Sequence, residues 1–346
     1  MNKIAYLHNH TDHGSNLRML DCINKVPALI DRAVELQAYG LAVTDHESLS
    51  AHVQALKYVK EGKEKGTIPE DFKLILGNEI YLVNSLEEVR NNYISKETQF
   101  WHFIILAKDL VGHKQLRELS SLAWENSFYT GKIERTPTVK ADLVKIVKAN
   151  PGHLIASTAC LGGELPYWIL RNNWDKVNEF LGFCYDLFGT DFFLEIQPSN
   201  SPDQIEVNKT IIKICDSCNF PYIVTTDSHY LKKEDRSIHE AYLNSREDEE
   251  RELADFYATT YLQNHEEIHE FLDEQIGSAC VETALNTTCI VADEIQEFDL
   301  YHKQIVPKVK IPNFTMQHSF ANAYEKYEYI KTVSYTHLRA HETRGN

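Results

Sequence analysis

The chain has 346 residues, of which 43% are hydrophobic and 25% charged, and its formal net charge is -16 at pH 7. This composition is that of an ordinary globular protein, and the sequence holds no run of about 18 apolar residues that could span a membrane. The acidic balance argues against broad, non-specific adhesion to nucleic acid, which requires a basic surface. A phosphate substrate is still compatible with it, because bound cations can supply positive charge locally.

The cysteines and the N-terminus indicate the cellular compartment. Seven cysteines form no repeated framework, which is typical of reduced thiols in a reducing compartment. The N-terminus also lacks the basic and then apolar pattern of a secretory signal. We therefore expect a cytoplasmic protein with no membrane partner.

Short apolar, β-rich runs alternate with longer segments in which apolar residues recur at helical spacing. The predicted strands cover residues 4–7, 40–44, 74–77, 103–106, 153–157, 192–196 and 222–226. Strands interleaved with helices imply an α/β fold with a mainly parallel sheet. Seven such strands favour a closed or nearly closed barrel, in which reactive residues collect at the C-terminal ends of the strands.

Potential metal ligands follow five of these predicted strands. They are His8 and His10 after the first, Asp45 and His46 after the second, Glu79 after the third, Cys160 after the fifth, and Asp227 and His229 after the seventh. The two residues of an H-x-H pair on an extended chain point to the same side, so they can hold one metal. Chance placement at five strand ends is improbable, which predicts a common site. His102 precedes its apolar run, so the residues alone do not decide between a ligand and a buried structural histidine.

The motifs HNH, TDH, GNE, WHFIILAK, ACLGGE and TDSHYL occur in this order along the chain. Together they resemble the polymerase and histidinol phosphatase (PHP) domain. More narrowly, ACLGGELP and DSHYLKKED resemble the PHP domain at the N-terminus of the bacterial DNA polymerase III alpha subunit. The resemblance covers residues 6–312 and implies a distorted seven-stranded (β/α) TIM-like barrel with a helical C-terminal extension.

The resemblance also implies a set of nine metal ligands. By motif they map onto His8, His10, Asp21, His46, Glu79, His102, Cys160, Asp227 and His229. Asp21 follows a longer loop than family members have, so Asp12 and His13 are alternatives to it, and the MLDC ending of the loop favours Asp21. Cys160 is interpreted as a ligand and not as a covalent nucleophile. Asp45 is predicted to orient a histidine by accepting its other ring N–H.

The ligand types indicate which metals bind. Histidine, carboxylate and one thiolate suit zinc, manganese or iron better than magnesium or calcium, and so many ligands predict two to three divalent transition-metal ions. Clustered ions about 3.5–4 Å apart can hold both the attacking and the leaving oxygen of a phosphate ester. The predicted catalytic residues are His8, His10, Asp45, Glu79, His102, Asp227 and His229.

The resemblance implies an N-terminal PHP fragment of a replicative DNA polymerase III alpha subunit, a DNA-directed DNA polymerase. The fragment would carry a metal-dependent phosphodiesterase site of the 3′–5′ exonuclease type and lack the polymerase site. Expected partners are the DNA primer 3′ end or single-stranded DNA, the remainder of the polymerase chain, and a proofreading or clamp subunit. Two alternatives stay open: a free-standing PHP phosphatase acting on a small phosphate monoester, and a metal-stabilised structural module without turnover.

The composition changes along the chain, which predicts four segments. They are a PHP barrel over 1–235, a helical extension that completes or flanks it over 236–298, a linker towards an absent polymerase palm domain over 299–332, and a non-native, adapter-like tail over 333–346. His337 and His341 in that tail are therefore excluded from the site. The charged stretch EDEEREL (247–253) is expected to be solvated.

Three other patterns are interpreted without a chemical role. HEEIH (265–269) matches the H-E-x-x-H pattern of zinc proteases but lies outside the predicted strands and lacks a third ligand in a matching context. Asn264 and Glu267 fit a capping box there, which predicts the start of a surface helix. CDSC (215–218) has no second C-x-x-C and lies on a helical pattern, which indicates packing cysteines. LGGE (161–164) is too short to form a nucleotide cradle by itself.

Overall fold

The computed structural model describes residues 3–17, 20–92, 100–130, 133–245, 256–303 and 324–331. One compact unit spans Met1–Leu300 and a second spans Tyr301–Asn346, in which residues 324–331 are helical. The EDEEREL stretch, most of the predicted linker (304–323 and 332) and the predicted tail lie outside the described residues.

All seven predicted strands are present in one sheet with the order β1-β2-β3-β4-β8-β9-β10. Their bounds are Ala5–Tyr6 (β1), Gly40–Val43 (β2), Lys73–Val83 (β3), Trp101–Ala107 (β4), Leu154–Ser157 (β8), Phe192–Ile196 (β9) and Tyr222–Val224 (β10). The sequence patterns missed three strands of three residues each: β7 (Pro137–Val139), which pairs with β3, and the hairpin of β5 (Phe128–Thr130) and β6 (Ile133–Arg135).

The sheet curls until its two edge strands approach each other. Beyond the ends of β1 and β10, Asn9 and Ser228 form a parallel bridge. The His10 amide donates to the Ser228 carbonyl at 3.0 Å, and the Ser228 hydroxyl donates to Asn9 Oδ1 at 2.9 Å. The expectation of a nearly closed, seven-stranded barrel is therefore confirmed.

One strand departs from the expected parallel arrangement. β4 is antiparallel to both of its neighbours, β3 and β8, whereas the other neighbouring pairs of the sheet order are parallel. The N-terminal end of β4 therefore lies at the same rim as the C-terminal ends of the other strands. This direction explains why His102 precedes its apolar run instead of following it.

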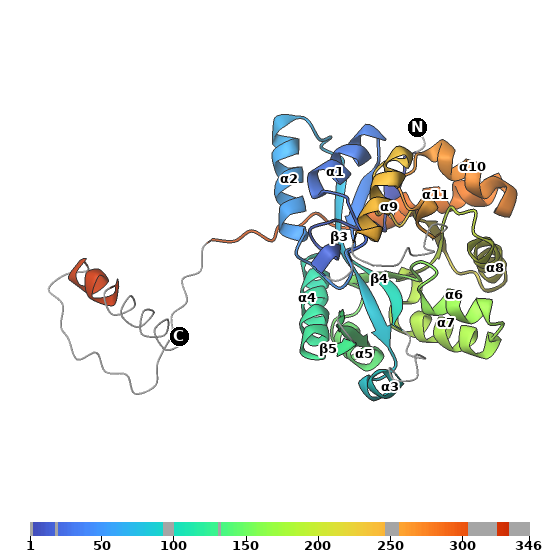
Figure 1. Cartoon of the computed structure of the whole chain (residues 1–346), viewed down its shortest axis with the longest axis horizontal. Coiled ribbons are helices and arrows are strands. Elements are labelled where there is room, and N and C mark those ends of the chain that lie inside the picture. The colour runs from blue at the N-terminus through green and yellow to red at the C-terminus, as the bar shows by residue number, and fades with distance from the viewer. Residues whose placement is uncertain are drawn as a thin grey trace. The chain divides into compact units, whose positions relative to one another are not determined.

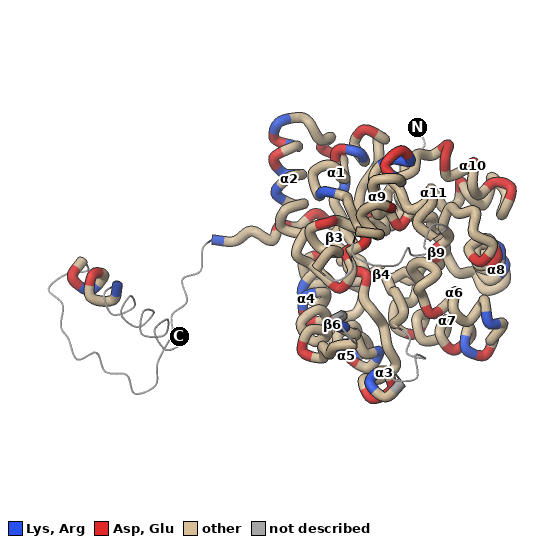
Figure 2. The backbone as a smooth tube through the Cα atoms, in the orientation of Figure 1, with Lys and Arg blue, Asp and Glu red and all other residues tan. Residues whose placement is uncertain are grey.

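Helices surround the sheet (Figure 1). They are α1 (Val26–Glu35), α2 (His52–Lys65), α3 (Leu86–Asn92), α4 (Leu110–Glu125), α5 (Lys140–Ala149), α6 (Glu164–Leu170), α7 (Trp174–Phe188), α8 (Pro202–Cys218), α9 (Arg236–Asn244), α10 (His265–Ile276) and α11 (Ser278–Asp293). Short 3₁₀ helices cover Ser15–Leu17, Gly189–Asp191, Lys233–Asp235 and Phe256–Thr259. Lys residues are interspersed with Glu on α2, whereas α10 carries Asp and Glu without Lys or Arg (Figure 2). In the described part of the chain, no helix combines the length and apolar content needed to cross a bilayer.

Side chains inside the barrel form layers, because successive residues of a strand point to opposite faces. Ile75, Ile104, Phe193 and Ile223 belong to a buried inner core, and the C-terminal end of α11 closes this core through Val291 and Ala292, with Ile295 just beyond the helix. Burying one such aliphatic side chain contributes roughly 1.5–3 kcal/mol. Polar residues two or four positions further along the same strands must therefore lie above this core, at the opposite rim.

Candidate metal centre

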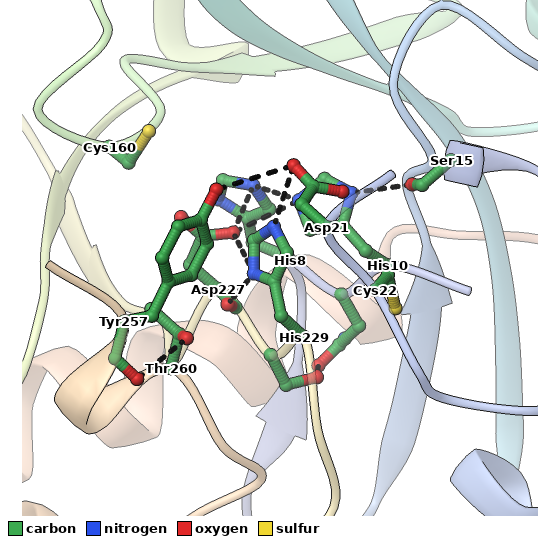
Figure 3. Close-up of polar contacts among 12 residues, drawn as sticks. His8, His10, Ser15, Asp21, Cys22, Cys160, Asp227, His229, Tyr257 and Thr260 are labelled. Atoms are coloured by element: carbon green, nitrogen blue, oxygen red, sulfur yellow. Dashed lines mark hydrogen bonds and ion pairs between the residues drawn. The ribbon is translucent and has the colours of Figure 1, made fainter. Parts of the chain in front are cut away.

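All nine predicted ligands lie in one network of contacts at the rim where the parallel strands end. Figure 3 labels His8, His10, Asp21, Cys160, Asp227 and His229 among them. Strand periodicity places several of them. Glu79 follows Ile75 by four residues on β3, and His102 precedes Ile104 by two on β4, so both side chains point to the face that carries the inner core. Asp227 adopts a left-handed backbone conformation, with φ +44°, which aspartate tolerates better than most residues.

Glu79 is the centre of this network. Its Oε2 lies 3.1 Å from His10 Nε2, 3.0 Å from His46 Nδ1 and 3.4 Å from His8 Nε2. Its Oε1 contacts Nδ1 of His102. One carboxylate therefore joins histidines that come from three different strands and their loops.

His8, His10 and Asp227 form a tight triangle of ligand atoms. The two Nε2 atoms are 3.1 Å apart, and Asp227 Oδ1 lies 3.2 Å from His8 Nε2 and 3.0 Å from His10 Nε2. Ligands bound tetrahedrally to zinc at 2.0–2.1 Å are separated by roughly 3.3 Å. The triangle thus has the dimensions of three ligands around one ion.

The structure brings Asp21, and neither of its alternatives, into the cluster. Asp21 Oδ2 lies 3.3 Å from His46 Nε2 and 3.7 Å from His229 Nε2, and it accepts a hydrogen bond from the Tyr257 hydroxyl at 3.4 Å. Asp12 instead pairs with Lys25 at 2.6 Å, and the side chain of His13 is exposed.

Cys160 and His102 lie side by side at the edge of the cluster. Cys160 Sγ is 3.5 Å from His102 Nδ1. The loop that carries Cys160 turns sharply, since Ala159 has φ +58°, and the Cys160 carbonyl accepts from the Gly163 amide at 2.8 Å. The His102 side chain is 25% exposed, whereas the side chains of His8, His10 and Glu79 are fully buried. His102 is therefore the ligand nearest to solvent.

The buried polar atoms of the cluster are left without enough hydrogen-bond partners. Asp21 Oδ1, Glu79 Oε1 and both ring nitrogens of His46 make no hydrogen bond of acceptable geometry to the described residues. A buried polar group without a partner is costly, but a cation between these atoms would satisfy them. Three overlapping groups have the geometry for an ion: His8–His10–Asp227, His10–His46–His229 and His46–Glu79–His102. The residues fit a multinuclear metal centre.

The charges in the cluster also suit cations. Burial alone would raise the pKa of Glu79, but the neighbouring His102 and His46 hold it well below its usual value, and His46 and His229 do the same for Asp21. Burial and the charges of Asp227 and Glu79 raise the pKa of the Cys160 thiol well above its usual value. Without metal the carboxylates are therefore ionised and Cys160 is a thiol, which a bound cation would deprotonate.

Sequence reasoning missed Glu195, which lies below the ligands. Its Oε1 accepts from Nδ1–H of His8 at 2.7 Å, and its Oε2 accepts from the Ser157 hydroxyl at 2.7 Å. The Thr225 hydroxyl also donates to Oε1. Glu195 holds the His8 ring so that Nε2 faces the cluster, the role often taken by a carboxylate behind a metal-binding histidine. The sequence did contain a signal for it: Glu195 follows Phe193 by two residues on β9, so both side chains point to the same face of the sheet.

Asp45 does not make the direct contact to a histidine that we expected. Its Oδ1 accepts from the Thr11 amide at 2.6 Å and from the Ser15 hydroxyl at 2.8 Å. Ser15 in turn contacts Nδ1 of His10 at 3.1 Å. Asp45 therefore acts on His10 through Ser15, because the loop after β1 folds back and places Ser15 between the two side chains.

The PHP domain family matches residues 7–199, which is more than half of the chain, and the chain belongs to this family. Curated relatives are DNA polymerases. The chain is 48% identical over 342 residues to "Probable DNA polymerase YorL" of Bacillus subtilis, covering 94% of this chain and 26% of that protein, and equally similar to a "DNA-directed DNA polymerase" of Bacillus phage SPbeta. It is 29% identical over 320 residues to the DNA polymerase III subunit alpha of Borreliella burgdorferi, covering 90% of this chain and 25% of that subunit.

The chain thus spans about a quarter of the length of the curated relatives it matches. Among solved structures, an amidohydrolase from Chromobacterium violaceum aligns with a TM-score of 0.40 and 14% identity, over 65% of this chain and 87% of that one. A TM-score below 0.5 does not identify a fold, so the fold assignment rests on the strand order and on the family match.

Proposed function

We propose that the chain is the PHP part of a replicative DNA polymerase alpha subunit and carries a metal-dependent phosphodiesterase site that removes nucleotides from a DNA 3′ end. The observation that carries the proposal is the convergence of nine potential ligands in one buried network that is short of hydrogen-bond partners. The polymerase relatives make DNA the favoured substrate.

The chain's own residues would divide the work as follows. His8, His10, Asp21, His46, Glu79, His102, Cys160, Asp227 and His229 would hold two to three zinc, manganese or iron ions. When bound, such ions supply positive charge that neutralises a phosphodiester and favours attack by water. Glu195 keeps Nε2 of His8 directed at the cluster. His102, the ligand nearest to solvent, marks the side from which a phosphate can approach.

Cys160 is not proposed as a nucleophile. Its thiol is buried and its pKa is raised by burial and by the neighbouring carboxylates, so the free protein holds the unreactive thiol form. A ligand role accounts for its position beside His102. The chemistry therefore requires no covalent intermediate on the protein.

The proposal extends to the whole protein. The remainder of the polymerase chain would be the principal partner, with a proofreading or clamp subunit beside it, in the cytoplasm of a bacterial or phage-infected cell. The nucleotidyl-transfer residues would lie outside this chain, so the chain alone should not extend a primer.

The near-complete burial of the cluster favours one alternative, a metal-stabilised structural module without turnover. Eight of the nine ligands are buried, which is typical of structural metal sites as well as of closed catalytic ones. In this alternative the metal contributes folding energy alone.

The decisive experiment incubates the full chain with MnCl₂ or ZnCl₂ and single-stranded DNA labelled at its 5′ end. Stepwise shortening from the 3′ end is expected, with a loss of at least 100-fold in Asp227→Asn and unchanged shortening in His13→Ala, whose side chain is exposed. DNA with phosphorothioate linkages at its 3′ end is the resistant control. Hydrolysis of p-nitrophenyl phosphate with no attack on DNA would overturn the proposal in favour of a phosphatase. A metal-dependent rise in melting temperature without either turnover would favour the structural module.

A further inference from the structure

A second group of metal-binding side chains lies outside the barrel rim, between α10 and α11. His265 and His269 are four residues apart on α10, so they lie on one face of the helix, and their ring centroids are 4.6 Å apart. Glu282 reaches them from α11. Its Oε1 lies 3.2 Å from His265 Nε2 and 3.2 Å from His269 Nε2.

These three ligand atoms are spaced for a single ion. All of them lie within 4.8 Å of one another, and both 3.2 Å separations are close to the roughly 3.3 Å edge of a tetrahedral zinc site. We propose that His265, His269 and Glu282 form a second metal site that binds one zinc-class divalent ion, separate from the barrel cluster. Glu282 is the third ligand that the H-E-x-x-H pattern lacked.

The neighbouring residues prepare His269 for this role. Nδ1 of His269 lies 2.7 Å from Asp273 Oδ1, one turn further along α10. Because the carboxylate accepts the Nδ1–H, Nε2 carries the lone pair that a metal requires, as in the carboxylate–histidine–zinc arrangement. Two imidazoles and one carboxylate suit zinc better than magnesium or calcium.

The surroundings admit an ion and attract it. The three side chains are 15–38% exposed, which leaves a path from solvent and room for water as a fourth ligand. Glu266, Glu270 and Glu274 line the same hollow, and acidic residues follow one another along α10 (Figure 2). Their negative charge raises the local concentration of cations.

An ion at this site would join two helices that the chain connects through Gly277. α11 packs against β10 and β1, the strands at the two edges of the curled sheet. Asn264 still caps α10, with its side chain accepting from the Glu267 amide at 2.9 Å. The predicted helix start is therefore present, and the site adds a metal bridge to α11 that is expected to stabilise the barrel closure.

The experiment counts zinc ions on the full chain by elemental analysis after equilibration with ZnCl₂ and gel filtration. The Glu282→Gln and His269→Gln variants are each expected to hold one ion fewer than the wild type, and zinc should raise their melting temperature less. Glu206→Gln, an exposed carboxylate-to-amide change on α8 that does not line the hollow, is expected to hold the wild-type number. Equal ion numbers in all four proteins would overturn the proposal.

A second readout locates the ion without depending on the total count. Diethyl pyrocarbonate modifies accessible imidazole nitrogens, and peptide mass spectrometry reports each histidine separately. Zinc should slow modification of His265 and His269 at least fivefold in the wild type and leave the rate unchanged in Glu282→Gln. Zinc protection that is equal in the two proteins would contradict the assignment of Glu282 as a ligand. A folded far-UV circular dichroism spectrum is required of each variant.

Discussion

His102, near the N-terminal end of β4, reaches Glu79 because β4 runs antiparallel to β3 and pairs His102 with Tyr81, two residues after Glu79. His102 is also the only one of the nine potential ligands that is not buried in the described structure. Because of its position at the edge and its exposure, His102 is expected to play a different role from the fully buried ligands His10 and Glu79. His102 lies on the solvent side of the cluster, whereas His10 is fully buried within it.

This difference predicts unequal effects of substitution. His102→Gln removes a peripheral ligand and should lower turnover on single-stranded DNA at least tenfold while the chain loses at most one bound ion. His10→Gln removes a nitrogen that contacts His8, Glu79 and Asp227 and should lower both metal content and turnover. Elemental analysis and DNA cleavage on the same samples provide the comparison. A loss of all metal from the His102 variant alone would contradict this division of roles.

Glu195 should control metal affinity without binding metal itself. Replacing it by Gln weakens the acceptor for Nδ1–H of His8, and losing such a partner typically reduces metal affinity or activity by about 10–100-fold. Competition against a fluorescent zinc chelator measures the change. Glu206→Gln, an exposed substitution on α8, is the matched control and should bind as the wild type does. An unaltered zinc affinity in Glu195→Gln would show that Glu195 does not support metal binding by orienting His8.

Gly163 should tolerate no side chain. A Cβ there would lie 2.2 Å from the Thr158 carbonyl oxygen, and Cβ atoms of real residues do not approach that closely. Gly163→Ala should therefore shift the Cys160 loop and lower the free energy of unfolding by about 1–3 kcal/mol. Gly182→Ala, on an exposed turn of α7 with open space around the position, should raise it by about 0.5–1 kcal/mol. Urea denaturation distinguishes the two, and a neutral Gly163→Ala would show that the loop adapts.

His52 and His113 form a buried pair away from the metal centre. Nε2–H of His52 donates to the Gly77 carbonyl at 2.9 Å, so its Nδ1 accepts from Nε2–H of His113 at 3.1 Å. Burial, together with the charge of His113, lowers the pKa of His52 to about 3, from 6.5. Both histidines are thus held neutral, since protonating His52 would break its contact to His113.

The lowered pKa makes stability depend on pH in a defined direction. Below pH 6.5 His52 is mostly protonated in the unfolded chain, whereas in the folded chain it stays neutral down to about pH 3. The free energy of unfolding therefore falls as the pH falls through this window, by about 2 kcal/mol at pH 5 for His52. The His52→Gln side chain can still donate to the Gly77 carbonyl. Between pH 7.5 and pH 5 the free energy of unfolding of this variant should therefore fall by about 2 kcal/mol less than that of the wild type. Urea denaturation in the presence of a chelator tests this, and equal losses in the two proteins would refute it.

The predictable part of the fold consists of features that are local in sequence. Each barrel strand is a short apolar run, and a ligand at its end, such as Asp227 after β10, is readable because the run and the ligand are adjacent. Adjacency to a strand did not separate Asp21 from Asp12 and His13, and only the resemblance of the MLDC ending favoured Asp21. The structure separates them, because Asp12 pairs with Lys25 and Asp21 faces His46.

The unpredicted part depends on contacts between distant segments. The direction of β4 follows from its pairing with β3 and not from its own residues. Glu195 is hidden within the apolar run FLEI, where a charged residue gains its partners from Ser157 on β8 and from Thr225, directly after β10. Glu282 joins His265 and His269 only because α11 folds back onto α10. In each case the sequence contains the residue, but only the packing supplies its partner.

The most direct test of the barrel metal centre is the number of metal ions bound by the Glu282→Gln chain, in which the proposed α10–α11 site is disabled. Elemental analysis of this protein, purified without chelator and equilibrated with ZnCl₂ or MnCl₂, should give two to three transition-metal ions per chain. Adding Asp227→Asn should lower that number, and adding His13→Ala should not. No bound metal in the Glu282→Gln chain, or an equal number after the Asp227 substitution, would contradict the assignment of this cluster as a metal centre.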